Sequence, residues 1–504
     1  MVHKRIIILF CLIGTLGSSY AQRTLLIHSV NIVDGSGHAA FRGSVRIKDS
    51  LIVGVGSLSP LATDTVVDGR NLFLSPGFID THSHHYGDLT RAPQSLATNS
   101  QGITTLVTGQ DGGSDPIDSI RAAFSVQGFS VNVASYTGHS TLREHVLGTT
   151  NLGRPATSEE IEQMKRLLAI EMKNGSLGLS SGLEYEDAFY SSTQEVLALA
   201  QEAAQWGGRY ISHIRSEDVT LDSALEEILY IGRITKMPVQ ISHLKIGLKD
   251  TWGAAKSILQ RLDAARREGI DVTADVYPYD FWSSTLRVLF PKRDYTHLAS
   301  AQFAVDHLFD PAQSVLIRYA PQRSYVGQTV SAVAALRRSS ASQTLIDLIS
   351  ESDRFKSANP NYSFGVEAIA AKAMTESDVR DFIGWTHSNI CSDGRSGGHP
   401  RGFGAFTKIL RVYVREEKML TLEQAIHKMT DMSARHVGIQ KRGLIKPGYY
   451  ADLVLFDPSV VSDRSTLTDP TALSEGIHCV WINGRVTYQD KTSTDNRPGV
   501  FIRR

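Results

Sequence analysis

The sequence has few cysteines and no excess of charge of either sign. Its 504 residues include three cysteines, too few for a disulfide framework. Lysine plus arginine number 52 and aspartate plus glutamate also number 52, so the formal net charge is zero. A neutral chain without a basic patch offers no electrostatic attraction to nucleic acid or to an anionic membrane. No run of eighteen apolar residues follows residue 21, so we expect no membrane-spanning helix in the mature chain.

The first 21 residues have the pattern of a secretory signal peptide. A basic start is followed by an apolar segment over residues 6–16, which is too short to cross a bilayer, and then by a small-residue cleavage site at Ala21. We expect cleavage before Gln22 and an exported protein, either periplasmic or secreted. Cleavage leaves Cys391 and Cys479, and the sequence alone does not decide whether they form a disulfide.

Both ends of the chain are rich in short β-strands. Between residues 24 and 75, and again near the C-terminus, strand-like runs alternate with Asp-Gly, Asp-Ser and Asn-Gly turns. We expect the two ends, residues 22–75 and 441–504, to build one small composite β-domain together.

Between these ends, eight short apolar strands alternate with amphipathic helices. The expected strands are Phe78–Asp80, Thr104–Val107, Val131–Tyr136, Leu177–Ser180, Arg209–His213, Val239–His243, Asp271–Tyr277 and Asn389–Asp393. Eight β/α units predict a TIM-type (β/α)8 barrel over residues 76–440, with its chemistry at the carboxyl ends of the strands. A doubly wound sheet is the alternative. The alternation stops between about 283 and 363, which we interpret as an insertion able to cover the barrel mouth.

Histidines follow several of these strands. His82 and His84 come directly after the first strand, and their i, i+2 spacing places both imidazoles on one side of an extended segment. His213 and His243 each end an Ile-Ser-His run at a later strand end. A single pair of this kind is usually a surface feature. Four histidines at the mouth of one barrel predict a metal site.

Asp393 follows the last expected strand and precedes Gly394. On its own this pair would be an ordinary Asp-Gly turn. Hydrolysis at a metal needs a carboxylate that accepts the proton of water and passes it to the leaving group. Beside four histidines, Asp393 is therefore the candidate catalytic residue.

Nine segments support a specific resemblance through their joint order and spacing. They are PGFIDTHSH at 76–84, QGITT at 101–105, GHSTLR at 138–143, GLSSGLEY at 178–185, SHIRSE at 212–217, ISHLK at 241–245, VYPY at 276–279, SDG at 392–394 and HPR at 399–401. With the closing segment at 443–454, the chain resembles the metal-dependent amidohydrolase superfamily and, within it, the D-aminoacylase (N-acyl-D-amino-acid deacylase) family. The resemblance implies a distorted TIM barrel with a small composite β-sandwich.

The resemblance also implies roles for the residues at the strand ends. His213 and His243 match the ligands of a tightly held zinc ion. His82 and His84 match a second, often weakly occupied, metal position. Asp393 matches the catalytic acid and base of the family.

One metal ligand departs from the family pattern. D-aminoacylases have a metal-binding cysteine in a Gly-Asn-Cys-Gly turn, whereas this sequence has Gly-Gln-Asp-Gly at 109–112, with Asp111 in place of the thiolate. A carboxylate binds zinc but also suits harder divalent ions, so the identity and number of the metal ions stay open. Asp111 could also be only a turn residue. Related amidohydrolases often bridge two metals with a carboxylate after the fourth strand, and Glu184 is a candidate for that role or a solvated residue near the rim.

The resemblance places the residues that grip a substrate carboxylate at Tyr185, Lys245 and Tyr277, with Arg401 or Arg215 as extra candidates. A free carboxylate requires fixed cationic and hydroxyl donors beside the amide to be cleaved. The expected substrate is a small N-acyl amino acid or a related peptide-like amide.

Three functions remain open on the sequence. An exported hydrolase of N-acyl-D-amino acids is the main prediction. A dipeptidase or a cyclic amidase of the dihydroorotase or hydantoinase kind is the alternative among enzymes. A solute-binding barrel without chemistry is the alternative outside enzymes, and the presence of Asp393 with four histidines argues against it.

Overall fold

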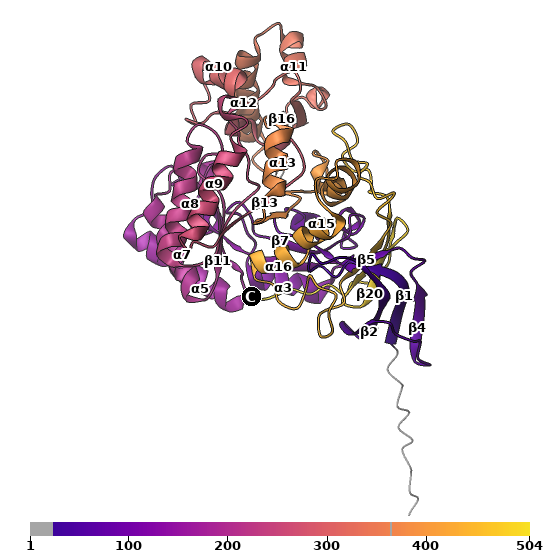
Figure 1. The fold of residues 1–504 in the computed structure, drawn as a ribbon. Coiled ribbons are helices and arrows are strands. Elements are labelled where there is room, and N and C mark those ends of the chain that lie inside the picture. Colours follow the sequence, from indigo (N-terminus) through magenta and orange to yellow (C-terminus); the bar gives the residue numbers. More distant parts are fainter. Residues whose placement is uncertain (1–23, 363–364) are drawn as a thin grey trace, which may run out of the picture.

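The structure is a computed structural model that describes residues 24–362 and 365–504, so the expected signal peptide lies outside the described residues (Figure 1). Its largest part is a ring of parallel strands surrounded by helices. The eight expected strands are present as β6 (Phe78–Asp80), β7 (Ile103–Thr108), β8 (Asn132–Ser135), β10 (Gly178–Gly182), β11 (Arg209–His213), β12 (Val239–Ile241), β13 (Val272–Val276) and β17 (Ser388–Ile390).

These strands follow one another around the ring in chain order. One sheet has the order β6-β7-β8, and a second has the order β9-β10-β11-β12-β13-β17, where β9 (Thr137–Gly138) directly continues β8. A parallel bridge between Ser83 and Gly394 brings the end of β17 back to the end of β6. The arrangement is a distorted barrel in which the carboxyl ends of all eight strands lie on one face.

Amphipathic helices cover the outside of the barrel, as the alternation of strands and helices predicts. Helix α5 (Ser158–Asn174) begins with a capping box of Thr157 and Glu160 and buries the stripe of Met164, Leu168 and Met172. The other helices that cover the barrel are α3 (Ile117–Val126), α4 (His139–Leu147), α7 (Thr193–Gln205), α8 (Leu221–Thr235), α9 (Ala255–Arg267), α13 (Glu376–Gly384), α14 (Arg401–Lys408), α15 (Leu422–Met429) and α16 (Asp431–Val437). No helix in the described ranges has the length and apolar character needed to cross a bilayer.

The expected insertion is a small subdomain with a core of its own. Strands β14 (Phe281–Ser284), β15 (Val315–Tyr319) and β16 (Glu367–Lys372) form a three-stranded sheet, which packs with α10 (Leu298–His307), α11 (Val330–Arg337) and α12 (Ala341–Ala358). The subdomain extends to Lys372, beyond the expected limit near 363, because β16 pairs with both β14 and β15. Figure 1 shows its helices at one end of the molecule.

The two ends of the chain build the β-domain together, as expected. Strands β1 (Thr24–Ile32), β2 (Phe41–Lys48), β3 (Leu51–Gly56), β4 (Asp64–Asp68) and β5 (Phe73–Pro76) share one nine-stranded sheet with β18 (Leu453–Phe456), β19 (Ile477–Ile482), β20 (Arg485–Gln489) and β21 (Thr492–Ser493). Strand β5 lies between β1 and β18 and joins the two halves. Cys391 and Cys479 are both buried and free, so they form no disulfide.

Candidate metal centre and active site

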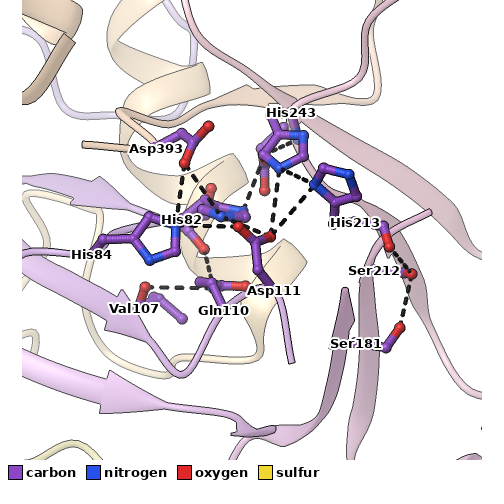
Figure 2. A network of polar contacts seen from close by, with 12 residues as sticks. His82, His84, Val107, Gln110, Asp111, Ser181, Ser212, His213, His243 and Asp393 are labelled. Atoms are coloured by element: carbon purple, nitrogen blue, oxygen red, sulfur yellow. Dashed lines mark hydrogen bonds and ion pairs between the residues drawn. The ribbon is translucent and has the colours of Figure 1, made fainter. Parts of the chain in front are cut away.

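The carboxylate of Asp111 lies at the centre of the histidines at the barrel mouth (Figure 2). Its Oδ1 is 3.3 Å from His82 Nε2, and its Oδ2 is 3.3 Å from His84 Nε2. The same Oδ1 is 3.5 Å from His243 Nε2 and 4.0 Å from His213 Nδ1. Asp111 therefore contacts both histidine pairs, which makes it the residue shared by two possible metal positions.

Two groups of side chains that contain Asp111 have the spacing of metal ligands. One group contains His82, His84, Asp111 and Asp393, and the other contains Asp111, His213 and His243. The five residues predicted from strand ends, together with Asp111, thus come together in one place.

The backbone at this centre has an unusual conformation. Asp111, His243 and Asp393 have positive φ angles of 56°, 36° and 47°. For residues other than glycine, such backbone conformations cost about 1–3 kcal/mol each. They cluster at functional sites. His243 and Asp393 also lie just beyond β12 and β17, which explains why those strands end earlier than the sequence predicts.

Glycine allows the turn that carries Asp111 to pack closely on the next loops of the barrel. A Cβ atom on Gly182 would lie 2.2 Å from the carbonyl oxygen of Asp111, and a Cβ atom on Gly138 would lie 2.2 Å from that of Gly112. Real Cβ atoms do not approach so closely. The position of the Asp111 carboxylate thus depends on glycine at the last positions of β9 and β10.

Buried atoms at the centre lack hydrogen-bond partners. Both ring nitrogens of His82 and Oδ1 of Asp111 are buried and make no hydrogen bond with the described part of the chain. Buried polar atoms are normally satisfied, and a metal ion satisfies imidazole and carboxylate atoms of this kind. The donor set of nitrogen and oxygen atoms fits zinc or another divalent ion.

The charges at the centre also fit a cation. Burial alone would raise the pKa of Asp111, but the histidines, His82 foremost, hold it well below its ordinary value. Burial and Lys245 would lower the pKa of His243, but Glu217 and Asp393 outweigh them and raise it to about 10. The buried carboxylates therefore require positive charge close by, which a protonated histidine or a metal ion can provide.

Asp393 forms an ion pair at the mouth of the barrel. Its Oδ1 lies 3.2 Å from His84 Nε2, and its Oδ2 lies 2.7 Å from Nη1 of Arg401. Burial alone would raise the pKa of Asp393, but Arg401 and then His243 keep it well below its ordinary value. Asp393 is therefore an ionised carboxylate at neutral pH.

Glu184 lies beside the centre. Its Oε2 is 2.8 Å from His213 Nε2, the ring nitrogen that does not face Asp111. The structure thus places Glu184 on the outer side of His213, where a carboxylate can orient an imidazole. Glu184, His213 and Glu217 also form a third group with the spacing of metal ligands, which does not contain Asp111.

Sequence reasoning missed Glu217. Its two carboxylate oxygens accept hydrogen bonds from Lys245 Nζ at 2.6 and 2.7 Å, and Oε1 lies 3.1 Å from His243 Nδ1. Lys245 Nζ is also 2.6 Å from that same nitrogen of His243. The one available signal was that Glu217 follows His213 by four residues in a segment already identified as a match.

Tyr185, Tyr277, Lys245 and Arg401, the residues expected to bind a substrate carboxylate, line one cavity next to the centre. Burial raises the pKa of both tyrosines well above the ordinary value, so their hydroxyls remain neutral hydrogen-bond donors. The hydroxyl of Tyr277 has no hydrogen-bond partner in the described chain. Arg215 differs, because its guanidinium is bound to Glu227 at 2.8 Å and does not line this cavity.

The insertion forms part of the wall of this cavity. Its residues there are Trp282, Ser283, Ser284, Val288, Leu289 and Leu308. Arg401 Nη2 also donates a long hydrogen bond of 3.4 Å to the carbonyl oxygen of Ser283. The inserted subdomain thus contributes part of the wall at the barrel mouth.

Comparison with known proteins places this site in a family. A model of the amidohydrolase family matches residues 65–340 and 322–488. An N-acyl-D-aspartate deacylase from Alcaligenes xylosoxydans xylosoxydans is 32% identical over 97% of this chain and 97% of its own. A D-aminoacylase from the same organism is 32% identical over 95% of this chain and 97% of its own.

Solved structures of deacylases have the same fold as this chain over nearly its full length. A D-aminoacylase crystal structure superposes with a TM-score of 0.83 at 29% identity, covering 95% of this chain and 99% of the other. An N-acyl-D-glutamate deacylase from Bordetella bronchiseptica, solved with zinc and a phosphonate that mimics the tetrahedral intermediate, has the same TM-score, identity and coverage. A D-hydantoinase, at 15% identity and a TM-score of 0.57, shares the fold. The chain therefore belongs to the amidohydrolase family, among the D-aminoacylases, and is a hydrolase of carbon–nitrogen bonds other than peptide bonds.

Proposed function

We propose that this protein removes the acyl group from N-acyl-D-amino acids. The observation that carries the proposal is the position of Asp393, an ionised carboxylate in contact with the histidines of the centre and with Arg401 in the adjoining cavity. The nearly full-length similarity to deacylases of N-acyl-D-aspartate and N-acyl-D-glutamate supports the same reaction.

The residues present fit one or two divalent ions, and we propose zinc. His213, His243 and Asp111 would hold one ion, and His82, His84, Asp111 and Asp393 would surround a second position. Zinc bound there would polarise the scissile carbonyl and lower the pKa of water. Asp111 is the carboxylate that both positions share.

The other steps belong to side chains of the chain itself. Asp393 accepts the proton of the attacking water and passes it to the departing amine nitrogen, so the amide C–N bond breaks while a C–O bond forms. Arg401 keeps Asp393 ionised before the reaction. Lys245 and the Tyr277 hydroxyl hold the α-carboxylate of the substrate and fix the position of the amide.

A turnover screen tests the proposal. The purified, metal-loaded enzyme is assayed with N-acetyl-D-amino acids, N-acetyl-L-amino acids, dipeptides and hydantoins. We expect kcat/KM to be highest for N-acyl-D-amino acids. Preferential hydrolysis of dipeptides or of hydantoins would instead identify a dipeptidase or a cyclic amidase, and binding without turnover would identify a solute-binding protein.

We also propose that the protein is exported after removal of residues 1–21. The basic start, the short apolar segment and Ala21 before Gln22 support this proposal. N-terminal sequencing of protein purified from its native cells is expected to begin at or near Gln22. Retention of Met1 or Val2 would contradict it.

A further inference from the structure

A second cavity lies on the other side of the pair formed by Asp393 and Arg401. It has a volume of about 560 Å³ and reaches from His84 and Asp111 to strands β15 and β16 of the insertion. The residues that it shares with the first cavity are Tyr185, Ser283, Ser284, Asp393 and Arg401. The two cavities therefore meet at the candidate catalytic carboxylate.

Two arginines of this second cavity form no ion pair with an acidic residue of the described ranges, although Arg318 is close enough to Glu367 to lower the pKa of that carboxyl. Arg318, on β15, is half-buried, and Arg395, two residues after Asp393, lies at the solvent edge. Neither side chain makes an ion pair or a hydrogen bond with another residue of the described ranges. The cations of the first cavity differ, because Lys245 is paired with Glu217 and Arg401 with Asp393.

The acidic residues of the second cavity are engaged elsewhere. Asp111 lies among the histidines, and Asp393 is paired with Arg401. Glu367 is buried, accepts the backbone N–H of Leu286 at 2.8 Å, and has a pKa that burial raises to about 7. The second cavity thus has an excess of positive charge near neutral pH.

The proposed function determines which part of a substrate reaches this cavity. The α-carboxylate is held in the first cavity by Lys245 and Tyr277, and the amide lies beside Asp393. The acyl chain must then leave the amide in another direction, and the second cavity begins at the same carboxylate.

We propose that the second cavity binds the acyl group and that the preferred acyl group ends in a carboxylate, as in N-succinyl and N-glutaryl amino acids. This inference rests on the proposed deacylase function. Arginine is suited to the terminal group because its planar guanidinium binds a carboxylate through two parallel hydrogen bonds. Arg318 and Arg395, from the insertion and from the loop after β17, would bind that group from two sides of the cavity.

The test compares three substrates: N-acetyl-D-leucine, N-succinyl-D-leucine, which differs from it only in the acyl group, and N-acetyl-D-glutamate, which differs from it only in the side chain. We expect kcat/KM for the succinyl substrate to exceed that for N-acetyl-D-leucine at least tenfold. In Arg318→Gln and Arg395→Gln this ratio is expected to fall toward one, mainly through a higher KM for the succinyl substrate. Because each ratio is measured on one protein sample, partial misfolding of a variant cancels.

Arg323→Gln is the matched control, since Arg323 is an exposed arginine of the same insertion that lines neither cavity. Its ratio is expected to equal that of the wild type. No succinyl preference in the wild type, or a preference that survives both arginine substitutions, would overturn the inference. A preference for N-acetyl-D-glutamate that needs Arg318 would also overturn it, because the cavity would then bind the amino-acid side chain. If the enzyme hydrolyses none of the three substrates, the proposed function itself is contradicted.

Discussion

Arg401 lies 2.7 Å from Asp393, so the carboxylate expected to carry the proton is held in an ion pair at the junction of two cavities. Asp393→Asn retains the shape of this side chain but removes its basicity. We expect hydrolysis to fall by about 100-fold to 10,000-fold, the usual contribution of a general acid or base. Metal content, measured on the same samples, is expected to remain high. Full activity in the variant would show that another group moves the proton.

Asp111 contacts all four histidines, so its substitution is expected to affect the whole centre. Asp111→Ala is expected to weaken metal binding, whereas Asp111→Cys is expected to retain a site with a stronger preference for zinc over manganese, because a thiolate is a softer ligand. Competition titrations with both ions measure this shift. Unchanged affinity and preference in both variants would show that Asp111 is only a turn residue.

The two histidine pairs are expected to differ in their effect on metal content. His213→Ala and His243→Ala each remove a ligand from a three-residue group, and we expect loss of the tightly bound ion. His82→Ala removes one member of a four-residue group and is expected to retain that ion. Elemental analysis after dialysis measures the metal content of each variant. His38→Ala, at an exposed position, is the control. Wild-type metal content in both His213→Ala and His243→Ala would refute the assignment.

Glu217 is expected to act through the residues that it orients. Its carboxylate holds Lys245 and lies 3.1 Å from His243, and partners of this kind typically change metal affinity or activity about 10-fold to 100-fold when replaced. Glu217→Gln is therefore expected to weaken metal binding by that factor. Glu227→Gln, which removes the partner of Arg215 outside the centre, is the control. Equal metal affinities in the two variants would argue against an orienting role.

A buried ion pair outside the site is expected to contribute to stability. Arg143 and Glu195 both have fully buried side chains, and Glu195 also contacts His139 at 2.9 Å. Removing one partner of such a pair typically costs about 3–5 kcal/mol, because the other charge stays buried and unpaired. Glu195→Gln is expected to lower the free energy of unfolding at pH 7 by that amount, measured by denaturant titration. The exposed Glu159→Gln is expected to change it little.

The ion pair of Arg143 and Glu195 also predicts that the free energy of unfolding depends on pH. Burial would raise the pKa of Glu195, but His139 and Arg143 lower it from 4.5 to about 2. Because the folded-state pKa lies below the unfolded one, the stabilisation is complete above pH 4.5 and is lost as the pH falls toward 2. The shift corresponds to about 3 kcal/mol. The stability difference between the wild type and Glu195→Gln is therefore expected to shrink over this interval, and a constant difference would contradict the assignment.

Much of the site could be predicted from the sequence because it follows from topology. His82, His213, His243 and Asp393 each follow an apolar run with strand length, and a parallel barrel places the carboxyl ends of its strands together. The strand pattern alone does not predict Asp111 as a metal ligand, because only the resemblance to the D-aminoacylases distinguishes it from an ordinary turn residue.

Other residues could not be predicted in this way. Glu217 lies in a loop, and its contact with Lys245 depends on packing between segments that are distant in the sequence. Strand periodicity does not predict such packing. Arg318 lies on an inserted strand, and no rule of the barrel places inserted residues over its mouth. The early ends of β12 and β17 arise from the positive φ angles of His243 and Asp393, which local sequence preferences do not favour.

The position of β5 between β1 and β18 has a consequence for biosynthesis. Leu74 pairs with Leu455, so strands made first are completed only by strands made last. Until then, β5 presents an open edge, which is the kind of surface that promotes aggregation. A chain interrupted before Leu453 would lack the strand that pairs with β5 and would keep that edge exposed. We therefore expect proteases and chaperones to act on such an incomplete chain.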